Sequence, residues 1–224
     1  MGRRWISVVA AIAFAQIGLI ASLPLSAIER SVDASDPRAL IDSTSRILLD
    51  QIGLHRDDFR KHPAKLRALA DQVLLPHFDT QLAAQRVLAQ HWRTATPEQR
   101  KRFVEAFYNS LLAQYSDALV NFTSDRYEVL PARINEAQTA ATVPTKIRRS
   151  NGEQIPVNFS LRKAPEGWRV WDITVEGISY IKSFQADFGA EISQKGLEAV
   201  IQRLEAQGAK VDDTRTATAT QVNQ

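Results

Sequence analysis

The sequence contains no cysteine, so the fold is stabilised by packing alone and not by disulfide bonds. It also lacks a serine nucleophile elbow, an HExxH zinc motif and a glycine-rich phosphate loop. No charge of one sign dominates: the formal net charge of +3 includes two arginines close to the N-terminus. Nucleic-acid binding needs a concentrated basic face, and the short basic clusters at 100–102 and 146–149 are more simply solvated surface. These observations argue against the common catalytic motifs and against a nucleic-acid partner.

The N-terminal residues have the pattern of a secretory signal peptide. Two arginines precede an uncharged stretch from Trp5 to Ile28, and Leu25-Ser26-Ala27 suits cleavage after a small residue. Residues 1–27 are therefore predicted to be a signal peptide that directs the chain to the periplasm. The alternative is an uncleaved membrane anchor, because the stretch is long enough to cross a bilayer, although Pro24 interrupts it.

Composition divides the rest of the chain into three parts. Residues 28–35 are mostly polar and are predicted to be a linker, and residues 36–207 show no shift that would separate two domains. Residues 208–224 are rich in Thr, Ala, Gln and Asp and lack periodic apolar positions, so a disordered tail is predicted there.

The first half of the domain is predicted to be helical. Asp36-Pro37 and Thr96-Pro97 are helix starts, and Gln99 completes a capping box with Thr96. Gly53 and Pro76 are predicted to end helices. The expected helices cover residues 36–52, 56–62, 63–75, 79–92 and 97–122.

The second half changes to period-two alternation. Strands are predicted at residues 127–130, 138–149, 155–162 and 168–175, with a tight hairpin at Asn151-Gly152, and helices at residues 178–188 and 191–207. Trp171, Ile173 and Val175 are expected to share one face of the last strand, and prolines within the strands indicate edges or bulges. The fold class is therefore α+β, a curved antiparallel sheet covered on one face by several helices. Periodicity does not decide whether the space between the layers is filled or hollow.

Four segments, taken together and in order, resemble the MlaC family, also called the toluene-tolerance or ABC transporter auxiliary family. They are DQVLLPHFD (residues 71–79), LAQHWRTATPEQR (88–100), WDITVEGIS (171–179) and KGLEAV (195–200). The likeness extends over about residues 36–207, with Ala89 where many members have glycine.

The resemblance implies a monomeric, non-enzymatic periplasmic carrier that encloses the acyl tails of a phospholipid between sheet and helices. It implies transient docking to an outer-membrane Mla lipoprotein complex and an inner-membrane Mla ABC transporter complex. No cofactor or metal is implied; the phospholipid is cargo. We expect an apolar cavity with few polar groups at its mouth.

The predicted lipid-binding residues are apolar positions of the two layers. The helical set is Leu74, Leu75, Leu82, Leu88, Phe103, Phe107 and Leu111. The sheet set is Ala141, Val143, Ile147, Val157, Phe159, Ile173 and Val175, with Ile178 added by resemblance. For each residue taken singly, a place in an ordinary core explains the pattern equally well.

Three other functions stay open on sequence grounds. The first is a carrier of another apolar lipid, such as a hopanoid, which would need the same kind of apolar cavity. The second is a protein-binding periplasmic adaptor with a filled core and no lipid cargo. An enzyme would need paired acid and base groups. Asp172 and Glu176 are the nearest such pair in the sheet, and a capping or hairpin role explains them better.

Overall fold

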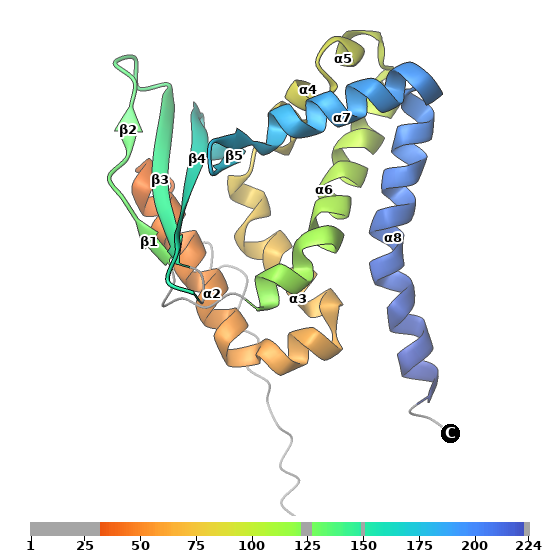
Figure 1. Cartoon of the computed structure of the whole chain (residues 1–224), viewed down its shortest axis with the longest axis horizontal. Helices are drawn as coiled ribbons and strands as arrows, with labels where there is room; N and C mark the ends of the chain where they lie inside the picture. The colour runs from red at the N-terminus through yellow and green to blue at the C-terminus, as the bar shows by residue number, and fades with distance from the viewer. Residues whose placement is uncertain (1–31, 122–126, 149–150, 222–224) are drawn as a thin grey trace, which may run out of the picture.

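The computed structural model describes residues 32–121, 127–148 and 151–221, which form one antiparallel sheet and a set of helices (Figure 1). The predicted signal peptide lies outside the described residues. Among the residues that are described, no helix is both long and apolar enough to cross a membrane.

Helices make up the first half, as predicted. They are α2 (Pro37–Lys61), α3 (Pro63–Val73), the 3₁₀ helix η1 (Leu75–His77), α4 (Thr80–Leu88), α5 (Gln90–Thr94) and α6 (Pro97–Val120). Side-chain caps fix the predicted starts, because the first N–H groups of a helix have no partner inside it. Asp36 accepts a hydrogen bond from the N–H of Ala39 at 2.7 Å, and Thr96 accepts one from the N–H of Gln99 at 3.1 Å.

Two of the helix boundaries predicted for the first half are wrong. α2 does not end at Gly53 but continues to Lys61 through one non-helical residue, His55 (φ −122°, ψ 22°), so the two expected helices form one kinked helix. A glycine inside a helix costs only about 1 kcal/mol, which packing readily offsets. Conversely, the helix expected over residues 79–92 divides at Ala89, whose φ of 48° and ψ of −115° are non-helical.

The sheet is a meander in the order β1-β3-β4-β5-β6, with β2 also paired to β3. Its strands are β1 (Tyr127–Val129), β2 (Arg133–Ile134), β3 (Ala140–Arg148), β4 (Gln154–Ala164), β5 (Gly167–Val175) and β6 (Ile178–Ser179). The predicted prolines lie where a neighbouring strand is unpaired: Pro144 falls between the β1 and β2 pairings, and Pro156 lies just beyond the end of the β5 pairing. The register shift is elsewhere, because Ser160 pairs with Asp172 whereas Leu161 pairs with Val170.

The chain ends in two helices, α7 (Tyr180–Lys195) and α8 (Leu197–Gln221). The break between them lies at Gly196 (φ 81°), and not near residue 190 as predicted, because a positive φ suits glycine. α8 also continues through residues 208–221, where composition predicted no regular structure. Gly208 packs against Asn109 of α6 at the start of this segment, so tertiary contact supports the helix beyond Gln207.

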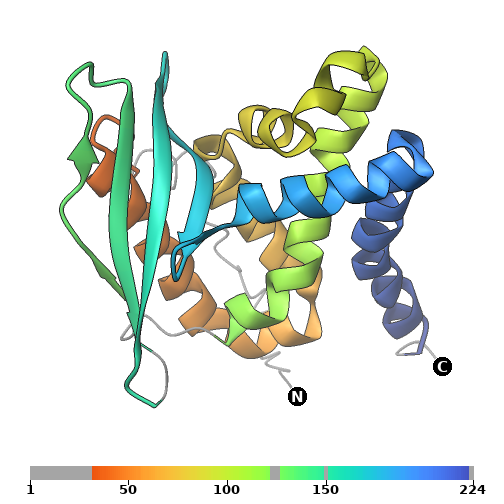
Figure 2. The same ribbon diagram turned by 45° about the horizontal axis from the view of Figure 1, so that its top comes forward.

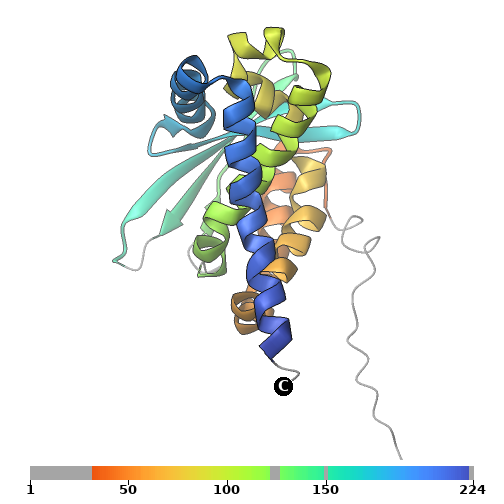
Figure 3. The same ribbon diagram turned by 90° about the vertical axis from the view of Figure 1, so that its right-hand side faces the viewer.

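α2 lies against the sheet, whereas α6, α7 and α8 lie on the far side of β5, with α8 outermost (Figures 1 and 2). α8 packs along α6 (Figure 3). Most of the buried apolar side chains of the described residues fall into three clusters. The sheet cluster joins α2 to the sheet and comprises Leu40, Ile41, Val129, Ala141, Val143, Leu161, Trp168 and Val170. The α2–α3 cluster contains Leu48, Ile52, Phe59, Leu66, Leu69, Val73 and Val120, and the α6–α8 cluster joins α4, α6, α7 and α8. Phe78, which is partly buried, packs against both the sheet cluster and the α6–α8 cluster.

Candidate functional site

Strand register places the predicted sheet residues on one face, which we call the inner face. Residues directly opposite one another in an antiparallel ladder point to the same side. Val143 pairs with Phe159, which pairs with Ile173 on its other side. Val157 likewise pairs with Val175, and Val175 pairs with Ile178 of β6. The complete predicted set on this face is Ala141, Val143, Ile147, Val157, Phe159, Ile173, Val175 and Ile178.

Coverage of the inner face is uneven. Ala141 and Val143 are buried in the sheet cluster beneath α2, and Phe159 and Ile173 are partly buried at its border. Coverage falls away toward β6, where Ile178 is 65% exposed. Ile147 and Val175 are also only partly buried, and neither belongs to a buried cluster. Water therefore reaches one end of an otherwise apolar face.

The predicted helical residues fall into two groups. Leu88 and Phe103 are 0% exposed and Phe107 is 5% exposed, all three within the α6–α8 cluster. Phe103 and Phe107 stack on one another with ring centroids 5.7 Å apart. These three side chains pack helix against helix.

The other four helical residues are partly exposed. Leu111 lies at the border of the α6–α8 cluster, and Leu74 lies at the border of the α2–α3 cluster. Leu75, in η1, belongs to no cluster, and Leu82 lines a separate cavity described below. The structure therefore does not bring all the predicted residues to one surface.

A group of aromatic residues between α6 and α7 was missed by the sequence reasoning. Tyr115 of α6 meets Tyr180 of α7 with ring centroids 6.0 Å apart, and Tyr180 in turn contacts Phe184 at 6.1 Å. Burial raises the pKa of Tyr115, and the neighbouring Tyr180 adds to the rise. Tyr180, Phe184 and Phe188 recur every four residues, a helical spacing that was available as a signal.

Asp172 fixes the junction between β5 and α7. Its carboxylate accepts hydrogen bonds from the Ser179 hydroxyl at 2.7 Å and from the N–H of Ile181 at 3.2 Å, and it is 6% exposed. The Ser179 hydroxyl also accepts a hydrogen bond from the N–H of Lys182. The capping role expected for Asp172 is thus confirmed.

Asp79 fixes the junction between η1 and α4 against the sheet. Its N–H donates to the carbonyl of Val170 at 2.6 Å, its carboxylate caps α4 through Leu82, and it pairs with Arg162 of β4. Asp79 is 5% exposed, whereas the Arg162 side chain is 45% exposed. This buried carboxylate attaches the α3–α4 connection to β5.

A cavity of about 460 Å³ lies where α4 and α5 face the end of β5 and the start of α7. Its apolar lining includes Leu82, Trp92 and Trp171. Trp171 is the additional residue at the register shift. Its side chain lines this cavity, so the prediction that it shares one face with Ile173 and Val175 is wrong. A shift of this kind re-aims a side chain and leaves no mark on the alternation of one strand.

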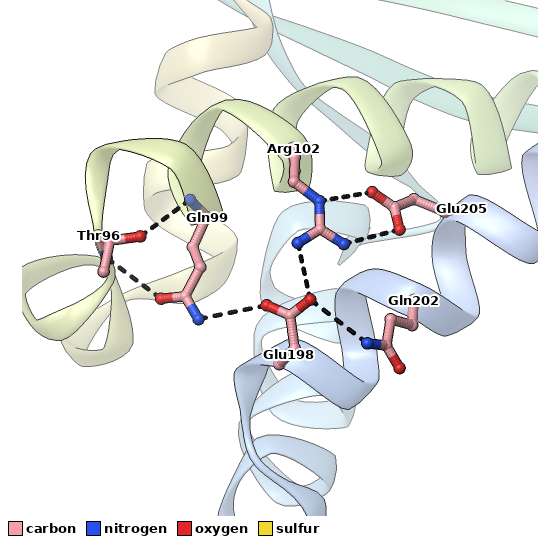
Figure 4. A network of polar contacts seen from close by, with 6 residues as sticks. All are labelled: Thr96, Gln99, Arg102, Glu198, Gln202 and Glu205. Carbon is pink, nitrogen blue, oxygen red and sulfur yellow. Dashed lines mark hydrogen bonds and ion pairs between the residues drawn. The ribbon is translucent and has the colours of Figure 1, made fainter.

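A polar network joins α6 to α8 (Figure 4). The Arg102 guanidinium donates two hydrogen bonds to Glu205, at 2.8 and 2.9 Å, and one to Glu198 at 2.7 Å. These hydrogen bonds lower the pKa values of both glutamates. Gln99 of the capping box reaches Glu198 at 3.4 Å, so the start of α6 is tied to α8. Among the described residues, no cluster of His, Cys, Asp and Glu could hold a metal ion.

Comparison with known proteins decides the family. The family model described as "MlaC protein" matches residues 42–206. The chain belongs to the MlaC family. The resemblance noted in the four sequence segments is thereby confirmed, and so is the α+β fold class.

Relatives of this MlaC chain have descriptive names. The toluene tolerance protein ttg2D of Pseudomonas putida is 27% identical over 179 residues, which cover 80% of this chain and 81% of that protein. The intermembrane phospholipid transport system binding protein MlaC of Haemophilus influenzae is 20% identical over 178 residues, covering 78% and 83%. Because the Haemophilus relative is named a binding protein, the MlaC match supports the expectation of a non-enzymatic role.

A solved structure has the same fold as this MlaC chain. It is the phospholipid-binding protein from Ralstonia solanacearum in complex with a phospholipid, with a TM-score of 0.72 and 26% identity. The match covers 80% of this chain and 99% of that one.

Proposed function

We propose that this chain is a periplasmic phospholipid carrier that holds acyl chains against the inner face of its sheet. The observation that carries the proposal is the incomplete cover of that face. Ile147, Val175 and Ile178 are apolar, point to the inner face and are left partly or largely exposed, while the buried core is divided among three clusters.

Energetics explain why such a face suits a carrier. Moving about 30 methylene groups from a bilayer into water costs on the order of 24 kcal/mol, at about 0.8 kcal/mol per group. A carrier must offer an interior that is about as apolar as the bilayer, and must not bind much more tightly. Partly covered side chains such as Ile173 and Val175 lose their remaining contact with water when a chain lies on them.

Individual lipid contacts follow from exposure. We propose that the tails contact Ile147, Phe159, Ile173, Val175 and Ile178 of the sheet, with Leu75 and Leu111 on the helical side. Leu88 and Phe103 are fully buried, so they would not touch the lipid but would hold α4 and α6 in place. The Ralstonia protein, which has the same fold, was solved with a phospholipid bound, and this supports phospholipid as the class of cargo.

Partners and location extend the proposal. We propose that residues 1–27 export the chain to the periplasm, where it exchanges lipid with an outer-membrane Mla lipoprotein complex and an inner-membrane Mla ABC transporter complex. The Haemophilus relative, named as part of an intermembrane phospholipid transport system, supports this role.

The test is organic extraction of the purified mature chain followed by mass spectrometry. We expect about one phospholipid per chain in wild type and a loss of most of it in Ile178→Glu, because an ionised group is strongly disfavoured against acyl chains. The matched control is Leu54→Glu on α2, where the apolar side chain is 73% exposed and belongs to no strand of the inner face. A folded Ile178→Glu protein that keeps its lipid would contradict the placement, and wild type without lipid would favour the adaptor. Recovery of a hopanoid instead would identify the other class of cargo.

A further inference from the structure

The cavity between α4, α5 and α7 is separate from the inner face. Asp172 and Ile173 are consecutive in β5, so their side chains point to opposite sides of that strand. Ile173 lies on the inner face, whereas Asp172 lines the cavity. The volume of about 460 Å³ is within the range of ligand-binding pockets.

Three cations surround this cavity without carboxylate partners. Arg86, Arg93 and Lys182 line it, are exposed, and form no salt bridge with a described residue. Arg102 and Arg203, by contrast, each pair with a glutamate. The cations near this cavity are therefore available to an outside group.

One acid among the lining residues offsets only part of these charges. Asp172 is the single acidic residue in the lining, and its carboxylate is already bonded to Ser179 and Ile181. The guanidinium of Arg86 lies over the Trp171 ring, 5.7 Å from its centroid, which holds that cation at the cavity wall. The lining thus combines apolar side chains, two tryptophans and more cations than acids.

We infer that this cavity is a docking site for an acidic segment of a partner protein. Arginine recognises carboxylates through paired hydrogen bonds, and tryptophan and arginine are enriched among the residues that dominate protein interfaces. The concave shape favours a protruding chain segment over a planar membrane surface, because a bilayer cannot enter a hollow. An apolar side chain next to the acidic groups would contact the lining residues Leu82, Trp92 and Trp171.

The walls of the cavity are already fixed. Asp79 caps α4 and Asp172 anchors the start of α7, so both helices hold their positions through buried carboxylates. Preorganised walls lower the ordering cost of association. This inference adds a docking site to the proposed carrier, and it does not depend on lipid being bound.

NMR titration of the mature chain with a synthetic peptide, Glu-Asp-Leu-Glu-Asp, tests the inference. We expect the indole N–H signals of Trp92 and Trp171 to shift, while that of Trp168, buried in the sheet cluster, stays in place. The counterpart peptide Gln-Asn-Leu-Gln-Asn should leave all three unchanged. Equal shifts with both peptides, or none with the acidic one, would overturn the inference.

Charge-removal variants make the test specific. The triple variant Arg86→Gln, Arg93→Gln, Lys182→Gln should weaken the peptide Kd by about tenfold or more. The matched control, Lys61→Gln, Lys101→Gln, Arg133→Gln, removes the same charge from exposed sites elsewhere and should change it by less than about twofold. An equal loss in both variants refutes a specific site.

Two further probes identify the ligand chemistry. If inorganic phosphate or phosphatidylglycerol vesicles shift the same indole signals and the peptide does not, the site binds phosphate and the inference is wrong. Lipid extracted from the triple variant should equal that from wild type, because the cavity and the inner face are separate. A triple variant that loses peptide binding but keeps its lipid would therefore support the docking site alone. Absence of lipid from the wild-type chain would contradict the carrier proposal and leave the docking site unaffected.

Discussion

Replacing Ala89 by glycine should stabilise the protein, although the same change inside a helix destabilises. Ala89 joins α4 to α5 with φ 48° and ψ −115°, a region that L-residues with a Cβ rarely adopt. Residues held in such conformations cost of order 1–3 kcal/mol. Glycine removes that cost but adds about 0.4–1 kcal/mol of unfolded-state entropy. The expected net gain is about 1 kcal/mol.

The assay is urea unfolding of the mature chain followed by circular dichroism, with thermal unfolding as a second measure. A gain of about 1 kcal/mol corresponds to about 2–4 °C in Tm for a domain of this size. The matched control is Ala68→Gly, an exposed position inside α3, which should lose about 1 kcal/mol. Opposite signs support the argument. A loss of stability in Ala89→Gly as large as that in Ala68→Gly would refute it.

Two further predictions concern charge. Asp79→Asn should lower the free energy of unfolding in urea by about 2 kcal/mol, because Asp79 is buried and pairs with Arg162. The control is Asp57→Asn, in the exposed ion pair with Arg60, which should cost under about 0.5 kcal/mol. Similar losses in both variants would show that burial of Asp79 is unimportant. Arg102→Gln should destabilise the chain at pH 7, and its difference from wild type should shrink as the pH falls below 4.5. Arg102 lowers the pKa values of Glu198 and Glu205 in the folded state, so its contribution is present above their ordinary pKa of 4.5 and is lost as they become protonated. A difference that is constant between pH 7 and pH 3.5 would argue against this pairing.

Local signals in the sequence predicted much of the fold. Asp36 and the Thr96–Gln99 capping box marked helix starts because a cap depends on residues three positions apart. The hairpin at Asn151-Gly152 and the alternation in β3 and β4 likewise depend on near neighbours. The break at Ala89 was hidden, because alanine is the best helix former and nothing local marks a positive φ there.

The candidate site was predicted only in part. Alternation correctly gathered Val143, Phe159 and Ile173 on one face, since pairing conserves the side to which a residue points. It could not show which apolar residues stay exposed, because exposure depends on helices distant in the sequence. Leu88 and Phe103 fit the helical stripe as well as Leu111 does, yet α7 and α8 bury them fully. Trp171 was misplaced because a register shift depends on the partner strand.

The division of the buried core into three clusters has a mechanical consequence for a protein that carries acyl chains. Phe78 packs against both the sheet cluster and the α6–α8 cluster, and Trp171 of β5 packs against the α6–α8 cluster, so partly buried side chains join the two layers. A hydrocarbon chain lying on Val175 would add apolar contact there, and stiffness would then rise with loading and fall on delivery. A receiving complex could distinguish full from spent carriers by their rigidity alone.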